Sequence, residues 1–453
     1  MTMRPRCPAP AGDPRPAPRP AGRRRAAVPA GLLAALALTA CTARPDAALS
    51  PPAAVAHRSP AAGTTAPAPH HPADDGAVSA PHHPAGAGAE SALHRLVTDG
   101  APGAASLTTR GGGSFAARFA TTGVADLHSG RRIGPQDHFR AGSITKTLVA
   151  TVILQLVAEG RLTLHDSAAA HLPPGVPTRA RGDGSDLRRV TIRQLLDHTS
   201  GLFNYTADPR LSRQLSGAGF GTHRYDSHTP GELLRIALDH PPVAPPGTRP
   251  HGPKGMGGAP FAYSNTNYLV LGLVIEAVTG HPYAAEIRRR ILVPAGLGHT
   301  SFPGTDPVLP EPHGRGYARI GHHRVDATSL DPSRAGAAGE MITTLGDLNR
   351  FFSALLGGKL LAPRQMAEIR NEKGTGGTYG LGLFATALPC GVTVWGHDGD
   401  INGSYTRTAG TADGRQVVSF RVNTAPLPDP AHGTAVLTAE FCARRPTGGR
   451  PAP

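Results

Sequence analysis

The stretch FRAGSITK at residues 139–146 runs directly into the apolar sequence TLVATVILQLVAEG at 147–160. The apolar sequence predicts a buried helix that ends at the glycine. Ser143 should therefore lie at the helix N-terminus, with Lys146 three residues later on the same face. A neighbouring lysine can take the proton of a serine if burial lowers its pKa, and a helix N-terminus favours developing negative charge. This spacing predicts Ser143 as a nucleophile and Lys146 as its base.

A lone S-x-x-K is common by chance, and the alternative is a capped helix with a surface lysine. Lys146 stands beside an apolar helix and not within a charged stripe, which favours the chemical interpretation.

Two further motifs follow along the chain. In FAYSN at 261–265, Tyr263 can bring a phenol near the nucleophile and Asn265 an amide for the acyl chain of a substrate. WGHDGD at 395–400 is expected to follow a strand at 391–394 and to precede another at 404–411. A strand passing the nucleophile can supply a backbone oxyanion donor and an edge for substrate pairing. The alternatives are a helical turn with an incidental tyrosine and a glycine-rich hairpin with a satisfied histidine.

Together and in this order, the three motifs resemble the S-x-x-K, Y-x-N and H-x-G or K-T-G set of the class C β-lactamase and D-alanyl-D-alanine carboxypeptidase family of penicillin-recognising serine hydrolases. The flanking text agrees: LLDHTSGL at 195–202 resembles the segment between the first two motifs, and AAGEMITT at 337–344 resembles the entry to the next helix. YGLG at 379–382 resembles the strand before the third motif. The resemblance covers roughly residues 92–443.

The resemblance implies an α+β fold, an α/β sandwich in which the N- and C-terminal parts of the body form one antiparallel sheet flanked by helices. The middle, roughly residues 150–370, should be mainly helical, with Ser143 in the cleft between the two parts. The sequence agrees in outline, because strand-like text lies at both ends of the body and helix-like text in between.

The resemblance also implies acyl transfer. Lys146 and Tyr263 would share the base role, and Ser143 would attack a carbonyl whose oxyanion is held by backbone N–H groups of Ser143 and near Asp400. Asn265 would orient the acyl chain, and Tyr263, helped by His397, would return a proton to the leaving group. The substrate-binding residues are expected to be Asn265, Gly399, Asp398 and Asp400. No metal or cofactor is required, and the substrate would be a small molecule or a peptide, with peptidoglycan-derived peptides among the candidates.

One feature departs from the carboxypeptidase pattern. Relatives carry a hydroxyl residue after the histidine, where it helps to bind the substrate carboxylate, but here that residue is Asp398, with Asp400 two further on. Repulsion between these carboxylates and a substrate carboxylate could cost about 1–4 kcal/mol. Carboxypeptidase, esterase, amidase, amine-preferring peptidase and β-lactamase activities therefore stay open. The competing class is a non-hydrolytic penicillin-binding or scaffold lipoprotein, against which Ser143, Lys146 and Tyr263 argue.

A signal peptide is expected at residues 1–40. Arginines at 23–25 precede the short apolar run 26–40, which is typical of a secretory leader. The run ends Leu38-Thr39-Ala40-Cys41, which resembles a bacterial lipobox and predicts a lipid on Cys41. The product would be a lipoprotein anchored on the outer side of the cytoplasmic membrane. An ordinary cleavage site is the alternative, and the Sec and twin-arginine routes both stay open.

Residues 41–91 are rich in Ala, Pro and His and predict a disordered tether, followed by the hydrolase body at 92–443 and a disordered tail at 444–453. With Cys7 in the leader and Cys41 lipidated, Cys390 and Cys442 are left as an even pair and predict a disulfide in an exported chain. The formal net charge of +14 arises partly in the leader. The remaining basic residues form no stripe of the nucleic-acid-binding type.

Overall fold

The computed structural model describes residues 84–111, 116–180, 184–248, 260–427 and 429–442. The expected signal peptide, the lipidated Cys41, most of the tether and the C-terminal tail lie outside the described residues. Of the described helices, none is both long and apolar enough to cross a membrane.

The centre of the fold is a six-stranded antiparallel sheet in the order β2-β1-β10-β9-β8-β7. Strands from the N- and C-terminal parts of the described body pair within it, since Ala104 of β1 lies opposite Val422 of β10. The strands of this sheet are β1 (Gly103–Arg110), β2 (Ala116–Gly123), β7 (Phe384–Ala387), β8 (Thr393–Ile401), β9 (Ser404–Gly410) and β10 (Gln416–Val422). A second, three-stranded sheet contains β11 (Thr424–Ala425), β4 (Tyr317–Ile320) and β5 (His323–Asp326). A third sheet pairs β3 (Phe139–Arg140) with β6 (Ile342–Thr343).

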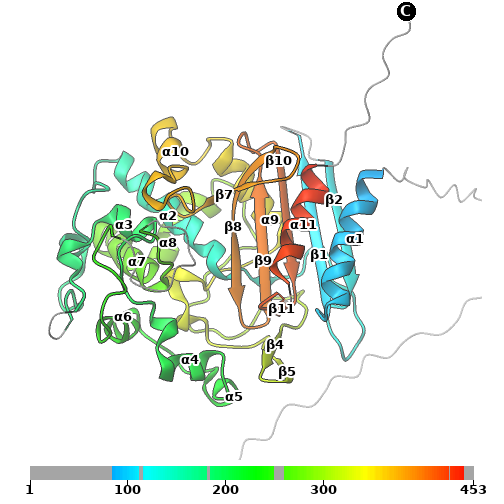
Figure 1. The fold of residues 1–453 in the computed structure, drawn as a ribbon, viewed down its shortest axis with the longest axis horizontal. Coiled ribbons are helices and arrows are strands. Elements are labelled where there is room, and N and C mark those ends of the chain that lie inside the picture. The colour runs from blue at the N-terminus through cyan, green and yellow to red at the C-terminus, as the bar shows by residue number, and fades with distance from the viewer. Residues whose placement is uncertain (1–83, 112–115, 181–183, 249–259, 428, 443–453) are drawn as a thin grey trace, which may run out of the picture. The chain divides into compact units, whose positions relative to one another are not determined.

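Helices cover both faces of the sheet. One face packs against α1 (Pro84–Thr98) and α11 (Pro430–Phe441), which lie side by side in Figure 1, and the other against α9 (Leu345–Leu356). The alternation of strand residues explains this: Val418, Phe420 and Val422 join the core under α1 and α11, whereas Val417 faces the larger core. This arrangement confirms the predicted α+β fold with a flanked antiparallel sheet.

The middle of the chain is mainly helical and holds the larger core. Its longest helices, α2 (Thr145–Ala158) and α7 (Asn265–Thr279), are apolar around most of their circumference and are almost entirely buried. The shorter helices are α3 (Ile192–Leu196), α4 (Pro209–Leu215), α5 (Phe220–His223), α6 (Pro230–Leu238), α8 (Tyr283–Ile287) and α10 (Pro363–Ile369). In Figure 1 this region lies beside the β7–β8 edge of the sheet.

Three expected boundaries need correction. Helix α1 begins at Pro84, inside the stretch expected to be tether up to residue 91, because Ala92, Leu93 and Leu96 bury against the sheet in a core shared with α11. The WGHDGD motif lies within β8 and not after a strand. The YGLG segment at 379–382 is not a strand, since Gly382 has a φ of +93°, and β7 begins only at Phe384.

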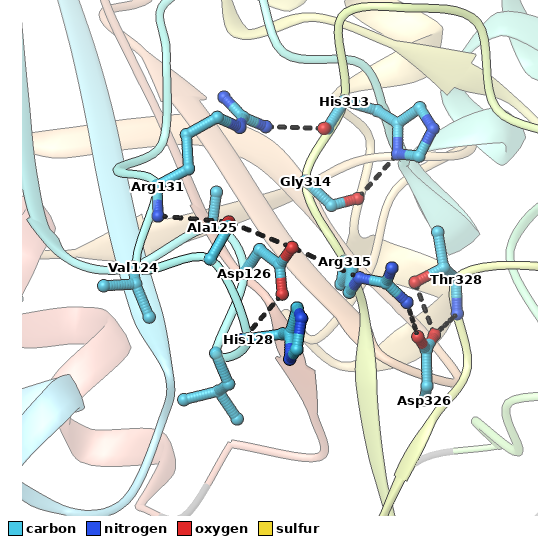
Figure 2. A network of polar contacts seen from close by, with 12 residues as sticks. Val124, Ala125, Asp126, His128, Arg131, His313, Gly314, Arg315, Asp326 and Thr328 are labelled. Atoms are coloured by element: carbon cyan, nitrogen blue, oxygen red, sulfur yellow. Dashed lines mark hydrogen bonds and ion pairs between the residues drawn. The ribbon is translucent and has the colours of Figure 1, made fainter.

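A polar network joins the segment after β2 to the β4–β5 hairpin (Figure 2). Arg315 forms ion pairs with Asp126 at 3.4 Å and with Asp326 at 2.5 Å. Arg131 donates to the backbone oxygen of His313. These contacts fasten the hairpin to the N-terminal strands. The C-terminal strands are secured by the disulfide between Cys390, in the β7–β8 turn, and Cys442, after α11.

Candidate active site

A tight turn places Ser143 against strand β8. Gly142 has a φ of +56°, and a Cβ at that position would lie 2.7 Å from the backbone nitrogen of Asp400, so glycine is required there. Residues Gly142–Ile144 form a 3₁₀ turn that leads into α2. Within this turn, the Thr145 hydroxyl donates to the Gly142 oxygen at 2.7 Å. The nucleophile is thus fixed at the junction of the sheet and the helical region.

Lys146 is fully buried directly behind the nucleophile. Its Nζ lies 2.9 Å from Ser143 Oγ, 2.8 Å from Asn265 Oδ1 and 2.6 Å from the backbone oxygen of Ala338. Burial lowers the pKa of Lys146 well below its usual value, although Asp398 opposes this shift. A neutral amine has two N–H donors and one lone pair. It can therefore donate to Asn265 and Ala338 and accept the Ser143 proton.

Tyr263 covers this group from the solvent side. Its ring centroid lies 5.0 Å from Lys146 Nζ. Burial raises the pKa of Tyr263, and Ser143 opposes that shift. The His198 ring stacks on Tyr263 at 4.2 Å between centroids. His198 adopts a φ of +60°, a conformation that is rare for a residue with a side chain.

The end of β8 supplies the second side of the site. Strand β7 pairs with β8 only up to Gly396, so residues 397–401 have a free edge on that side. A Cβ on Gly399 would lie 1.9 Å from the Ala141 oxygen and 2.9 Å from the Ser143 nitrogen. Because Gly399 lacks a side chain, the strand lies close to the turn, and the N–H groups of Ser143 and Asp400 can serve one oxyanion.

The two aspartates on β8 project from the face of the strand opposite Gly399. The Asp398 side chain is 45% exposed and lies across from Arg407, whose guanidinium donates to Thr386 and Thr434 instead. The Asp400 side chain reaches solvent and lines the cavity beside Ser143. Although this side chain reaches solvent, neighbouring residues remove part of the water around its carboxylate, and this raises the pKa of Asp400 to about 6. The nearby charge of Asp398 raises it further.

His397 was expected to assist Tyr263, and in the structure it contacts Tyr379. Its ring is buried, with Nε2 2.7 Å from the Tyr379 hydroxyl and Nδ1 bonded to the backbone oxygen of Asp398. Burial lowers its pKa to about 4. Tyr379 has ring contacts with both His397 and Tyr263, at 5.6 and 6.4 Å between centroids. The structure therefore brings Ser143, Lys146, Tyr263 and Asn265 together and connects His397 to them through Tyr379.

A cavity of about 310 Å³ opens beside Ser143. Asn265 and Asp400 line it near the nucleophile, and Arg334 and Asn402 line it as well. The Nδ2 atom of Asn265 lies 3.4 Å from Thr206 Oγ1, which leaves its second N–H for a bound acyl chain.

Sequence reasoning missed four participants: the Ala338 carbonyl, His198, Tyr379 and Arg334. The first three lie inside stretches that already carried the family resemblance, so those stretches were the available signal. Arg334 lies just before AAGEMITT, and no pattern in the sequence distinguishes it from a surface arginine.

Known proteins resemble this chain in sequence and fold. The family model described as Beta-lactamase matches residues 89–442. The structure of a D-stereospecific amidohydrolase from Streptomyces sp. is 40% identical, with a TM-score of 0.69, and covers 79% of this chain and 99% of that one. PbpX of Bacillus subtilis, a penicillin-binding protein by name, is 30% identical over 58% of this chain, and the match spans 57% of its length.

Esterase EstB of Burkholderia gladioli is 29% identical over 59% of this chain and 71% of its own length. The relatives thus include proteins named as an amidohydrolase, an esterase and a penicillin-binding protein. With its fold and a family match across most of its length, the chain belongs to the Beta-lactamase family of serine hydrolases.

Proposed function

We propose that this protein hydrolyses amides or esters through an acyl-enzyme on Ser143, with substrates whose leaving group lacks a free carboxylate. The observation that carries the proposal is the 2.9 Å contact between Ser143 Oγ and the buried Lys146 Nζ, whose other two contacts are acceptors. The 40% identity to a D-stereospecific amidohydrolase supports an amide substrate.

In the first step, neutral Lys146 takes the Ser143 proton while Oγ forms a bond to the substrate carbonyl carbon. The carbonyl oxygen gains the negative charge and lies between the N–H groups of Ser143 and Asp400. The bond to the leaving group then breaks, and Tyr263 passes the proton from Lys146 to the departing nitrogen or oxygen. A water molecule then gives a proton to Lys146 and attacks the carbonyl carbon of the acyl-enzyme ester. The bond between that carbon and Ser143 Oγ breaks, and Oγ takes the proton back from Lys146.

Asp398 determines the preferred leaving group. Its carboxylate is half-exposed beside the free edge of β8. In the described residues no arginine forms an ion pair with it, because the guanidinium of Arg407, across on β9, donates to Thr386 and Thr434. A leaving group that ends in a carboxylate would meet this charge, whereas a neutral or cationic one would not. D-Alanyl-D-alanine peptides are therefore expected to be poor substrates.

A substrate panel tests the proposal. It contains D-amino acid amides, short p-nitrophenyl esters, a D-alanyl-D-alanine peptide and nitrocefin, assayed with the chain lacking residues 1–41 and with its Ser143→Ala variant. We expect turnover of amides or esters that is lost in the variant. Absence of turnover for every member would instead favour a non-hydrolytic penicillin-binding role, and equal turnover by the variant would exclude Ser143.

We also propose that the protein is exported and lipid-anchored on the outer side of the cytoplasmic membrane, where peptidoglycan-derived peptides would be accessible substrates. The support is the Leu38-Thr39-Ala40-Cys41 sequence after an apolar run. Mass spectrometry of the protein from a native membrane fraction should find a diacylglyceryl group on an N-terminal Cys41. A free Cys41 thiol or a different N-terminus would contradict the anchor.

A further inference from the structure

The cavity beside Ser143 is lined by the buried guanidinium of Arg334, and the nearest carboxylate that acts on it, that of Asp331, forms no ion pair with it. Arg334 is only 5% exposed, and no carboxylate in the described part of the chain forms an ion pair with it. One nitrogen, Nη2, donates to the Leu215 oxygen at 2.6 Å and to Asn402 Oδ1. The other terminal nitrogen, Nη1, is buried and has no hydrogen-bond partner among the described residues. Burying a guanidinium that lacks hydrogen-bond partners costs free energy unless an anion binds to it.

Several contacts fix Arg334 relative to the nucleophile. Its backbone oxygen accepts from the buried Tyr205 hydroxyl at 2.8 Å. The chain then passes through two 3₁₀ turns, Pro332–Arg334 and Gly336–Ala338, to the carbonyl that binds Lys146. Arg334 and Ser143 line the same cavity, so an acyl chain that fills it would contact both residues.

Two more charged side chains line the cavity. Arg319, on β4, is exposed and lines the same cavity, whereas Asp400 contributes a carboxylate near the nucleophile. Apolar side chains, including Leu215, Ile401 and Pro426, form other parts of the wall. A ligand that fills the cavity away from Asp400 could present an anion to Arg334, whose Nη1 is the terminal nitrogen left without a hydrogen-bond partner among the described residues. A carboxylate there would accept a charge-assisted hydrogen bond.

We infer that Arg334 is a specificity-determining residue that binds a carboxylate on the acyl part of the substrate. This inference rests on the proposed acyl transfer at Ser143 and adds the chemical class of the acyl group. The preferred acyl groups are short and acidic, with glutamate-like side chains as the model case. Since Asp398 disfavours a carboxylate on the leaving group, the enzyme would distinguish the two sides of the scissile bond by charge.

Two matched substrates test the inference: the α-p-nitroanilides of glutamate and glutamine, each as both enantiomers. They differ only in a carboxylate against an isosteric amide. We expect kcat/KM to favour glutamate by about 10- to 100-fold, the range for a hydrogen bond to a charged group. In Arg334→Met the ratio should fall to about one. In Arg364→Gln, at an exposed arginine on α10 that does not line the cavity, it should change by less than about threefold.

The ratio is measured within each variant, so it does not depend on the fraction of protein that is folded. Turnover of p-nitrophenyl acetate, whose acyl group is too short to reach Arg334, reports on the proposed acyl transfer separately. Normal acetate turnover without a preference for glutamate would overturn the inference alone. If acetate is not hydrolysed, calorimetric binding of free D-glutamate and D-glutamine decides. Tighter binding of glutamate that is lost in Arg334→Met supports the site, and equal binding overturns it.

Discussion

Gly399 and Ser143 are in backbone contact: a Cβ added to Gly399 would lie 2.9 Å from the Ser143 nitrogen and 1.9 Å from the Ala141 oxygen. The strand and the nucleophile turn can approach this closely only because residue 399 has no side chain. The two N–H groups that we assign to the oxyanion depend on this approach.

Replacement of Gly399 by alanine should therefore separate the two N–H donors. We expect kcat to fall by about 10²–10³-fold, the loss measured when one oxyanion donor is removed. Gly391→Ala is a control for a glycine substitution in the same hairpin, because its Cβ would meet no atom within 4 Å, although its positive φ makes some loss of stability expected. An active Gly399→Ala variant would show that the oxyanion is held elsewhere.

Lys146 is expected to act as a neutral base, and its exchange for arginine tests this. Arginine keeps a positive charge but does not lose its proton in the accessible pH range. Lys146→Arg and Lys146→Met should both reduce kcat/KM for a p-nitrophenyl ester by about 10²–10⁴-fold. If Lys146→Arg stays within tenfold of the native rate, the charge of Lys146 matters and its basicity does not.

Asp398→Thr restores the hydroxyl residue of the carboxypeptidase pattern. Because the Asp398 side chain is 45% exposed, water screens its charge, and we expect a moderate effect. The ratio of kcat/KM for a D-alanyl-D-alanine peptide over a D-amino acid amide should rise by about 5- to 20-fold. An unchanged ratio, or a native enzyme that already prefers the peptide, would refute the role given to Asp398.

Glu340 should make stability depend on pH. It is 3% exposed, it accepts from the Gly304 nitrogen at 3.0 Å, and burial raises its pKa to about 7. Because the folded state holds this proton more tightly than the unfolded state, the stabilisation is complete below about pH 4.5. It is lost as the pH rises to about 7. The change is on the order of 1–3 kcal/mol.

Urea unfolding at pH 5 and pH 8 measures this effect. Glu340→Gln should remove most of the difference in unfolding free energy between the two pH values. The control Glu311→Gln, at a carboxylate that is 81% exposed, should leave the difference unchanged. Identical pH dependence in the native protein and Glu340→Gln would assign the effect to other groups.

The Cys390–Cys442 disulfide fastens α11 to the β7–β8 turn and closes a segment with a sequence separation of 52. Its removal by Cys442→Ser should lower the unfolding free energy by about 2–4 kcal/mol. Because the bond lies away from the cavity residues, kcat/KM under native conditions should stay within twofold. Equal stability of native and variant proteins would indicate that the bond contributes nothing to folding.

The sequence was sufficient to predict the helix and the reactive groups where local hydrophobic pattern and side-chain chemistry agree. The apolar run after Lys146 predicted a buried helix, and the serine spacing then placed both groups on one side of it. Tyr263 and Asn265 were found because the motif spacing carries a family resemblance. The same reasoning failed for the start of α1. Ala89, Ala92, Leu93 and Leu96 recur at helical spacing and are buried, but the first part of this helix shares the alanine-rich composition of the expected tether.

Tertiary contacts account for the remaining differences. His397 was assigned to the site by its motif. It shares the face of β8 with Gly399, and its bond to the Tyr379 hydroxyl is a tertiary contact that a linear pattern cannot show. Likewise, the acceptor for Lys146 is a backbone carbonyl at Ala338, which carries no side-chain signal. Arg334 becomes notable only when its burial and its lack of an ion pair are known.

The central claim is that Ser143 forms a covalent acyl-enzyme with Lys146 as its base. The most direct measurement is mass spectrometry of the protein after brief reaction with a fluorophosphonate or a slowly hydrolysed p-nitrophenyl ester, followed by peptide mapping. The account predicts one adduct, located on Ser143, in the native protein and none in Ser143→Ala. An adduct on another residue, or equal labelling of Ser143→Ala, would contradict it.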